Sequence, residues 1–324
     1  MIAPIGRLAP SPTGGLHLGH ARTFLVAWLA ARSRGGRIVY RVEDLDAGRA
    51  RAEAVAGAMA DLRWLGLDWD HGPDVGGPDG PYVQSERQGI YADTLDRLKA
   101  AELVYPCTCT RADIARAASA PHAEDEGPTY PGTCAGRSAA DADGLPDGFA
   151  WRFRVPAGSV AWDDRLRGRV ELDPARLGGD FVVGRQGVGA GYQLAVVVDD
   201  AAMGVTEVVR GDDLIPSTPR QLLLYRALGS DPPGFAHVPL AVAADGRRLA
   251  KRDGAPKLAT LRESGVDPRR LVGLLARSCG WSDQIEPSAP ADWLARFDLA
   301  ALPAAPWAVT PAELADLHGG VDPP

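Results

Sequence analysis

The first half of the chain alternates short apolar runs with longer stretches in which apolar positions recur every three or four residues. This alternation is typical of strand–helix–strand units built on a parallel sheet. The pattern predicts strands near residues 5–9 and at 37–44 ("RIVYRVED"), and helices at about 18–33, 49–65 and 86–102, the first closed by Gly35 and Gly36.

After residue 104 the regular pattern is interrupted. Residues 105 to about 147 are rich in Pro, Gly and Cys, and we interpret them as an insertion. The last ninety residues or so favour helices and end in a Pro/Ala-rich stretch. Between these regions we expect strands at "AWRFRV" (150–155), "FVVG" (181–184), "LAVVVDD" (194–200) and "EVVRGDD" (207–213), then a helix through "PRQLLLYRALG" (219–229).

The composition is that of a globular protein. Of 324 residues, 45% are hydrophobic, which is enough for a sizeable core. No run approaches the roughly 18 consecutive apolar residues of a membrane span, and no secretory signal is present, so we expect a cytoplasmic protein without a membrane partner. A net charge of −7 argues against indiscriminate nucleic-acid binding but allows a local basic patch. No protein partner is implied.

A glycine- and proline-rich turn precedes the first helix, in "RLAPSPTGGLHLGHART" (7–23). Backbone N–H groups converge at a helix N-terminus, where the helix dipole favours anions, so phosphate is the expected ligand. His17 and His20 can donate hydrogen bonds to it. The alternative is that the two histidines only cap the helix.

Positive charge is carried almost entirely by arginine, since only Lys99, Lys251 and Lys257 are lysines among 35 basic residues. A lysine kept in such a chain invites a functional reason, although three could remain by chance. The loop "GRRLAKRDGA" (246–255) presents Lys251 as a mobile point charge for a pyrophosphate. The alternative is an ordinary solvated loop.

Three of the four cysteines lie between residues 107 and 134, and Cys279 stands apart as a candidate buried thiol. Clustered thiols in a reduced compartment are more often metal ligands than disulfides. General zinc chemistry favours His122 beside Cys107, Cys109 and Cys134. Three unliganded thiols in a loop are the alternative.

Several of these stretches together resemble the class I aminoacyl-tRNA synthetases. The residues His17-Leu18-Gly19-His20 are similar to the HIGH signature, and residues 248–252 occupy the place of the KMSKS loop. The glutamyl-tRNA synthetases are indicated more narrowly, by a match spread over about residues 5–260. The stretches that carry it are "RLAPSPTG" (7–14), "RVEDLD" (41–46), "YQLAVVVDDAAMGVTEVVRGDDLIPSTPRQLLLY" (192–225) and "HVPLAV" (237–242).

The resemblance implies the fold class α/β, with a Rossmann-type doubly wound parallel sheet, a zinc-containing insertion and a short C-terminal helical region. It implies four parts of the chain: the first half of the catalytic domain (1–104), the zinc-containing insertion (105–182), the second half of the catalytic domain (183–238), and the KMSKS-like loop with the helical region (239–324).

The resemblance also implies which residues activate glutamate with ATP and Mg²⁺. We assign no protein ligand to the Mg²⁺ ion. His17, His20 and Lys251 are expected to be catalytic and, with Gly19, to bind ATP. For any one of Arg7, Glu43 and Arg210, an ion-pair network at strand ends is the alternative. The expected glutamate site comprises Arg7, Leu8, Ala9, Pro10, Ser11, Glu43, Tyr192 and Arg210, and the KMSKS-like loop comprises Arg248, Leu249, Ala250, Lys251 and Arg252.

The zinc site of that family is similar to the set Cys107, Cys109, Tyr130 and Cys134, with tyrosine as an unusual fourth ligand. On this basis we expect one zinc ion per chain. Tyr130 is preferred to His122 because its spacing to Cys134 matches the family pattern.

Two features depart from ordinary glutamyl-tRNA synthetases. Arg248 and Ala250 replace the first lysine and the serine of KMSKS, and activation is expected to survive this change. Only about seventy residues follow Lys251, which we expect to be too few for an anticodon-binding region. The chain therefore resembles the branch that activates glutamate without tRNA and transfers it to queuosine of tRNA(Asp). The alternatives are a compact enzyme that charges a tRNA 3′ end and a non-catalytic tRNA-binding paralogue.

Overall fold

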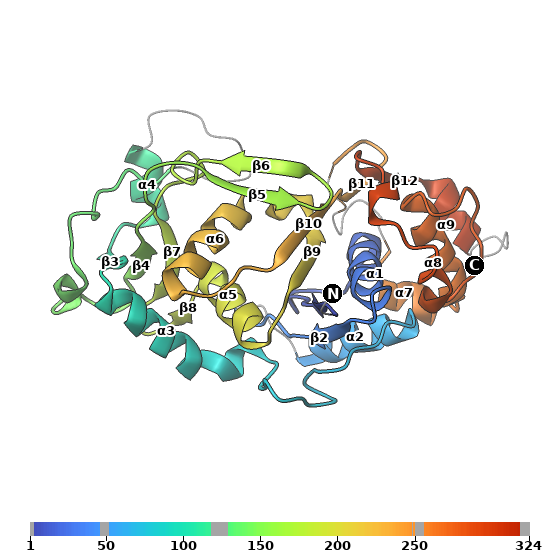
Figure 1. Ribbon diagram of the computed structural model, residues 1–324, viewed down its shortest axis with the longest axis horizontal. Coiled ribbons are helices and arrows are strands. Elements are labelled where there is room, and N and C mark those ends of the chain that lie inside the picture. The colour runs from blue at the N-terminus through green and yellow to red at the C-terminus, as the bar shows by residue number, and fades with distance from the viewer. Residues whose placement is uncertain (1–2, 46–51, 118–128, 248, 250–255, 318–324) are drawn as a thin grey trace.

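The computed structural model describes residues 3–45, 52–117, 129–247, 249 and 256–317. The molecule is elongated, with the cysteine-containing region at one end and the C-terminal helices at the other (Figure 1). Within the described ranges, no helix has the length and apolar character that crossing a bilayer requires.

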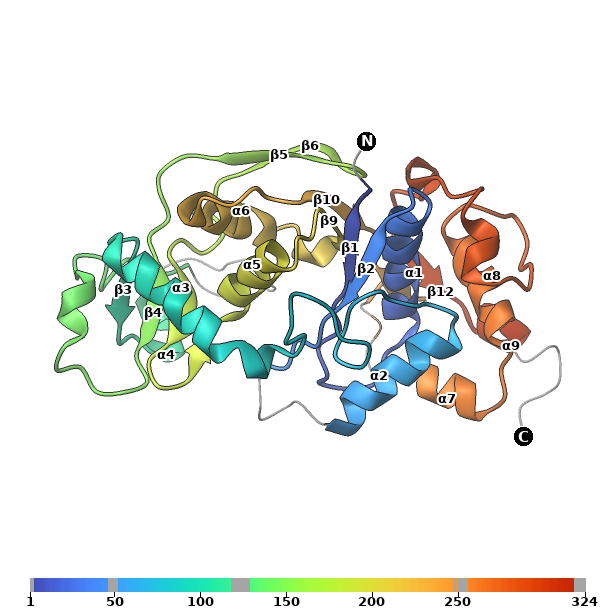
Figure 2. The same ribbon diagram turned by 60° about the horizontal axis from the view of Figure 1, so that its bottom comes forward.

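Four parallel strands form the centre of the molecule. Strand β1 (Ile5–Leu8) pairs in parallel with β2 (Arg37–Tyr40), and β9 (Glu207–Gly211) pairs in parallel with β10 (Gly234–Val238). The backbone N–H of Thr206, just before β9, donates to the carbonyl of Ile5 at 2.9 Å. Segments about 200 residues apart in the chain therefore lie side by side (Figure 2).

Helices cover both faces of this sheet, as the doubly wound fold class requires. Val209 faces the core that contains helix α1 (Leu18–Arg32), whereas its neighbour Val208 faces the core that contains α5 (Tyr192–Ala202) and α6 (Ser217–Leu228). Successive side chains of a strand point to opposite faces, so two buried neighbours mean two covered faces. The prediction of an α/β fold with a parallel sheet is confirmed.

The predicted strand at 194–200 is wrong, because these residues form most of helix α5. All of them are buried, between α3 (Gln88–Ala100), α6 and β7 (Phe181–Arg185). A segment buried on every side has no polar face, so neither the period of a strand nor that of a helix can be read from its sequence.

A second, antiparallel sheet carries the cysteine region. Its strands run in the order β3 (Val104–Cys107), β4 (Ala150–Phe153), β7 and β8 (Gly189–Ala190), and the short helix α4 (Arg111–Ala117) follows β3. The hairpin of β5 (Val160–Asp164) and β6 (Gly168–Leu172) instead joins the parallel sheet, where β5 lies beside β10.

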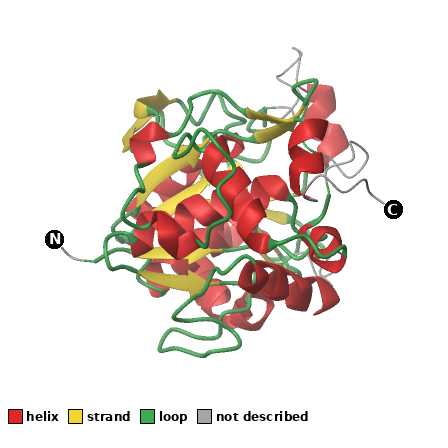
Figure 3. Ribbon diagram, turned by 90° about the vertical axis from the view of Figure 1, so that its right-hand side faces the viewer, coloured by secondary structure: helices red, strands yellow, loops and turns green. Residues whose placement is uncertain are grey.

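The C-terminal region packs against the outer side of α1. Leu271 and Leu275 of helix α8 (Pro268–Ser278) share a core with Leu25 and Leu29 of α1. Viewed from this end, helices lie in front of and beside the strands (Figure 3). The remaining elements of this side are α2 (Ala52–Trp64), α7 (Leu258–Glu263), α9 (Pro311–Leu317) and a parallel pair of strands, β11 (Ala241–Ala243) and β12 (Trp307–Val309).

Candidate active site

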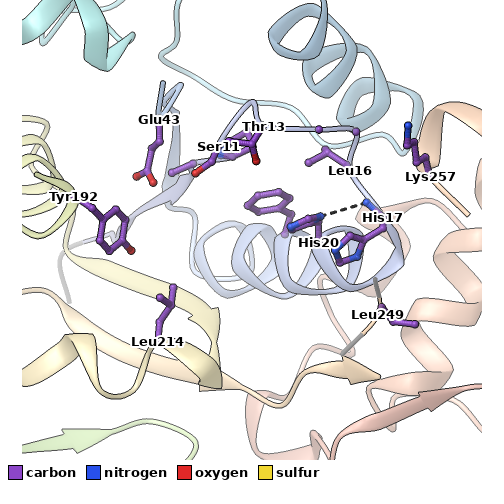
Figure 4. A pocket seen from close by; sticks show the side chains of 15 residues that line it. Ser11, Thr13, Leu16, His17, His20, Glu43, Tyr192, Leu214, Leu249 and Lys257 are labelled. Carbon is purple, nitrogen blue, oxygen red and sulfur yellow. Dashed lines mark hydrogen bonds between the residues drawn. The ribbon is translucent and has the colours of Figure 1, made fainter. Parts of the chain in front are cut away.

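A cavity lies where the carboxyl ends of β1 and β9 meet the N-terminus of α1 (Figure 4). Ligands of parallel α/β sheets bind at this edge. The cavity has two adjoining chambers. The glycine-loop chamber, of about 580 Å³, is lined by Gly14, Gly15 and Lys257, and the arginine chamber, of about 390 Å³, by Arg7 and Arg210. Both are lined by Ala9, His17, His20, Phe24, Glu43, Tyr192, Leu214 and Leu249.

Arg210 is a buried cation held by neutral acceptors. Its Nε donates to His237 Nε2 at 3.1 Å, and its Nη atoms donate to Gln221 Oε1 and Thr218 Oγ1, each at 2.8 Å. Among the described residues no carboxylate pairs with it. Burial lowers the pKa of Arg210, although the group stays charged at any ordinary pH. A buried guanidinium that lines a cavity without a counter-ion is a site for an anion.

Arg7 is tied to the same chamber by Asp200 of α5. Its Nε lies 3.2 Å from an Asp200 oxygen, and Arg41 Nη1 donates to the same carboxylate at 2.7 Å. Arg41 is fully buried and also donates to Glu43 Oε1 at 2.9 Å. The two arginines lower the pKa of Asp200 against the opposing effect of its burial, so it is ionised. Its charge orients Arg7 and leaves both Nη atoms of Arg7 without a partner among the described residues.

Glu43 and Tyr192 line both chambers. The backbone N–H of Glu43 donates to the carbonyl of Pro10 at 3.2 Å, which holds the turn after β2 against the turn after β1. Burial, and next the charge of Glu43, raise the pKa of Tyr192, so its phenol stays protonated. The cavity therefore offers an anion, a phenol and two guanidinium groups within one enclosure.

His17 and His20 cap the start of helix α1 and also line the cavity. His17 Nδ1 accepts from Gly19 N at 3.2 Å, and His20 Nδ1 accepts from His17 N at 3.3 Å, so each ring caps the start of α1. Because each Nδ1 is an acceptor, the proton of each neutral ring is on Nε2. Burial lowers the pKa of both rings, that of His20 to about 3 with a further contribution from His17. Near neutral pH both rings are uncharged donors that line the cavity.

The other predicted site residues are distributed unevenly around this cavity. Ser11 and Pro10 line the glycine-loop chamber, and Gly19 lines the arginine chamber. Leu8 is fully buried in the core and lines neither chamber, although its carbonyl accepts from Arg41 N at 3.0 Å. Leu249 of the KMSKS-like loop lines both chambers, whereas Arg248, Ala250, Lys251 and Arg252 lie outside the described residues.

Sequence reasoning missed the residues that hold the arginines. Asp200 lies 193 residues from Arg7, in the segment that was expected to be a strand. His237, which accepts from Arg210, is fixed in turn by Asp164 of β5 through its Nδ1. Burial lowers the pKa of His237, and the ring is therefore a neutral spacer between Arg210 and that carboxylate. No local motif marks these pairs, because each joins elements far apart in the chain.

The cysteine cluster lies away from this cavity, at the end of the molecule that carries β3, β4 and α4 (Figure 1). The Sγ atoms of Cys107, Cys109 and Cys134 all lie within 4.8 Å of one another. The Sγ of Cys107 is 3.4 Å from Tyr130 Oη, and the Sγ atoms of Cys109 and Cys134 are 3.7 Å apart. Sulfur ligands about 2.3 Å from a tetrahedral zinc ion lie about 3.8 Å apart, so these residues fit zinc. His122 lies outside the described residues.

The structure has two histidines at the N-terminus of α1, two arginines in the chamber that these histidines line, and a parallel sheet covered on both faces. These features are those of the catalytic domain of a class I aminoacyl-tRNA synthetase. The family model "tRNA synthetases class I (E and Q), catalytic domain" matches residues 5–314, and the chain belongs to this family. The family resemblance read from the sequence motifs is confirmed. The protein is a ligase, and its family implies ATP, an amino acid and tRNA as substrates.

Individual relatives agree with this assignment. The chain is 53% identical over 321 residues to a glutamyl-Q tRNA(Asp) synthetase of Symbiobacterium thermophilum, a match that covers 97% of this chain and 98% of the relative. A glutamate–tRNA ligase of Desulfosudis oleivorans is 42% identical over 86% of this chain and 57% of its own length. The solved glutamate-tRNA synthetase of Elizabethkingia anophelis is similar with a TM-score of 0.83 and 28% identity, over 98% of this chain and 70% of that one.

Proposed function

We propose that this enzyme activates L-glutamate with ATP in the absence of tRNA and transfers the glutamyl group to queuosine in the anticodon loop of tRNA(Asp). The observation that carries the first step is Arg210, a buried guanidinium that lines the cavity without a carboxylate partner among the described residues. The placement of Glu43 and Arg7 in the same cavity supports glutamate as the amino acid.

The substrate has two carboxylates and one ammonium group, and the chamber is complementary to them. Arg210 and Arg7 each present a guanidinium for charge-assisted hydrogen bonds to a carboxylate. Glu43 accepts from the ammonium group, and the phenol of Tyr192 is a neutral hydrogen-bonding group beside it. Ala9 and Ser11 border the space, and the remaining residues of the expected glutamate site, Leu8 and Pro10, hold the backbone of the turns.

The reaction needs no nucleophilic side chain. An oxygen of the substrate carboxylate attacks the α-phosphorus of ATP, a bond forms between them, and the bond from the α-phosphorus to the bridging oxygen breaks. Glutamyl-adenylate and pyrophosphate are the products. His17 and His20 donate from Nε2 to phosphate oxygens, Gly19 allows close approach, and Lys251 adds a positive charge as pyrophosphate departs. Magnesium enters with ATP.

The acceptor is the second half of the proposal. Support comes from the glutamyl-Q tRNA(Asp) synthetase of S. thermophilum, which is 53% identical and matches along 98% of its length, against 42% identity and 57% of the length for the glutamate–tRNA ligase. A ring hydroxyl of queuosine then attacks the mixed anhydride, an ester forms, and AMP leaves. The competing function is esterification of a 3′-terminal ribose.

Two measurements test this function. Pyrophosphate exchange into ATP should depend on glutamate and proceed without tRNA; exchange that requires tRNA contradicts the first step. For the second step, labelled glutamate is supplied with ATP and tRNA whose 3′-terminal adenosine has been removed enzymatically. Labelling should persist on the trimmed tRNA and vanish with tRNA from queuosine-deficient cells. Loss of labelling on trimming identifies a small tRNA-charging enzyme instead.

We further propose that Cys107, Cys109, Tyr130 and Cys134 bind one zinc ion. When bound, zinc supplies a cross-link that holds the polar insertion together. Elemental analysis of protein purified without chelator should give one zinc per chain, and joint Cys107→Ser and Cys109→Ser should abolish it. The control His122→Ala should retain the metal. Zinc loss in the control with retention in Tyr130→Phe would make His122 the fourth ligand.

A further inference from the structure

The two histidines that line the glycine-loop chamber supply no positive charge. His17 and His20 are uncharged near neutral pH, because burial lowers the pKa of both rings. Each ring donates one hydrogen bond through Nε2 but adds no charge. A triphosphate carries several negative charges, so neutral donors alone leave most of that charge uncompensated.

Among the described residues that line this chamber, Lys257 is the only lysine or arginine. It directly precedes helix α7, and an antiparallel bridge joins its backbone to His17. The N–H of Leu258 donates to the carbonyl of Leu16 at 2.8 Å, which fixes the segment against the turn before α1. The position of the Lys257 backbone is therefore set by the histidine motif itself.

The side chain of Lys257 runs along the glycine turn. A Cβ built on Gly15 would lie 3.0 Å from Lys257 Cδ, so a residue without a side chain leaves room for the lysine stem. Figure 4 shows Lys257 beyond Leu16, at the end of the cavity opposite to Glu43 and Tyr192. The ammonium group is thus well separated from the amino-acid end.

The ammonium group of Lys257 makes no hydrogen bond or ion pair with any residue that the structure describes. Lys99, the other described lysine, pairs with Asp96 at 2.9 Å. A lysine that is exposed, unpaired and anchored at its backbone is free to move its charge by several ångströms, as a group that follows a departing anion must.

We propose that Lys257 is a phosphate-binding residue of this enzyme that contacts the β- and γ-phosphates of ATP and the pyrophosphate product. It lies outside the KMSKS-like motif and acts in addition to Lys251. The proposal rests on the proposed function for the use of ATP. It assigns positive charge to the chamber end where the two histidines supply none.

Binding measurements separate a contact to the phosphate chain from a contact to adenosine. Equilibrium dialysis with ATP, pyrophosphate and AMP is compared for the unsubstituted protein, Lys257→Ala and Lys257→Arg. In Lys257→Ala the dissociation constants for ATP and pyrophosphate should rise about tenfold. That for AMP should change less than about twofold. Lys257→Arg should restore most of the affinity, and the matched control Lys99→Ala should change none of the three constants.

Two results would overturn the proposal. An equal loss of AMP and ATP affinity in Lys257→Ala assigns the effect to adenosine or to the backbone bridge at His17. Unchanged affinity for all three ligands makes Lys257 a surface lysine. These binding experiments contain no glutamate and no tRNA. They therefore give an answer even if glutamate-dependent pyrophosphate exchange fails. Failure of the proposed function is thus distinguishable from failure of this inference.

Discussion

The two chambers of the cavity differ in the groups that they offer to a bound anion. The arginine chamber holds buried, permanently charged guanidinium groups whose geometry is fixed by Asp200 and by the neutral acceptors around Arg210. The two uncharged histidine rings line both chambers, and the glycine-loop chamber adds a glycine turn and the exposed Lys257. Fixed charge suits a small substrate that must be recognised precisely, whereas neutral donors and a mobile cation suit a product that must leave.

The difference also has an energetic reason. A charge removed from water is costly unless it is paired or hydrogen-bonded, so the buried arginines require a surrounding network. The rim residues of the glycine-loop chamber remain in contact with solvent and need no such support. We therefore expect the arginine chamber to matter for stability as well as for binding, and the glycine-loop chamber to matter mainly for nucleotide.

The largest effect is expected from Asp200→Asn, which removes the carboxylate shared by Arg7 and Arg41. Breaking a buried ion pair leaves a buried charge without compensation, at a cost of about 3–5 kcal/mol. Denaturant unfolding of the variant should show a loss of this size, and the exposed control Asp163→Asn should show almost none. A loss below about 1 kcal/mol would mean that the arginines are solvated without Asp200.

A smaller effect, confined to one substrate, is expected from Arg210→Ala. Loss of a buried charged partner should lower kcat/KM for glutamate at least about 100-fold, or about 2.7 kcal/mol. The KM for ATP should change less than about twofold, since Arg210 lines only the arginine chamber. Pyrophosphate exchange at varied glutamate and varied ATP measures both, with exposed Arg169→Ala as the control. An equal rise in both KM values would remove the distinction between the chambers.

The smallest effect concerns pH and the neutral histidines. The folded pKa of His20 is lowered to about 3, so between that value and its ordinary pKa of 6.5 the unfolded chain binds more protons than the folded chain. Stability is therefore complete above about pH 6.5 and falls on acidification as this group is protonated in the unfolded chain.

The variant His20→Asn keeps a capping acceptor but does not titrate in this range. Unfolding free energies at about pH 5 and about pH 7 should therefore differ less in the variant than in the unsubstituted protein. Groups common to both proteins cancel in the comparison. Equal pH dependence in the two would mean that His20 is protonated in the folded protein.

Much of the site could be predicted because its motifs are local. The turn and helix N-terminus around His17 and His20 depend on neighbouring glycines and on capping within four residues, and the spacing of Cys107 and Cys109 places two thiols at the end of one strand. Interactions over such short distances along the chain are encoded where they act, so pattern and spacing reveal them.

Other features depend on contacts between distant segments. The helix at 192–202 was predicted as a strand at 194–200, because its apolar run is buried on every side. The pairing of Arg41 with Asp200 joins residues 159 apart, and that of His237 with Asp164 joins residues 73 apart. No periodicity records which carboxylate a buried arginine will meet.

The amino-acid sequence by itself therefore determined the parallel α/β fold, the family, and fewer than half of the residues that line the cavity. Tertiary structure alone decided that Arg210 has no carboxylate partner among the described residues, that both histidines are neutral, and that Lys257 lies at the far end of the chamber. The physical reason is that charge balance and burial are set by what surrounds a group in space, and those neighbours come from segments far apart in the chain.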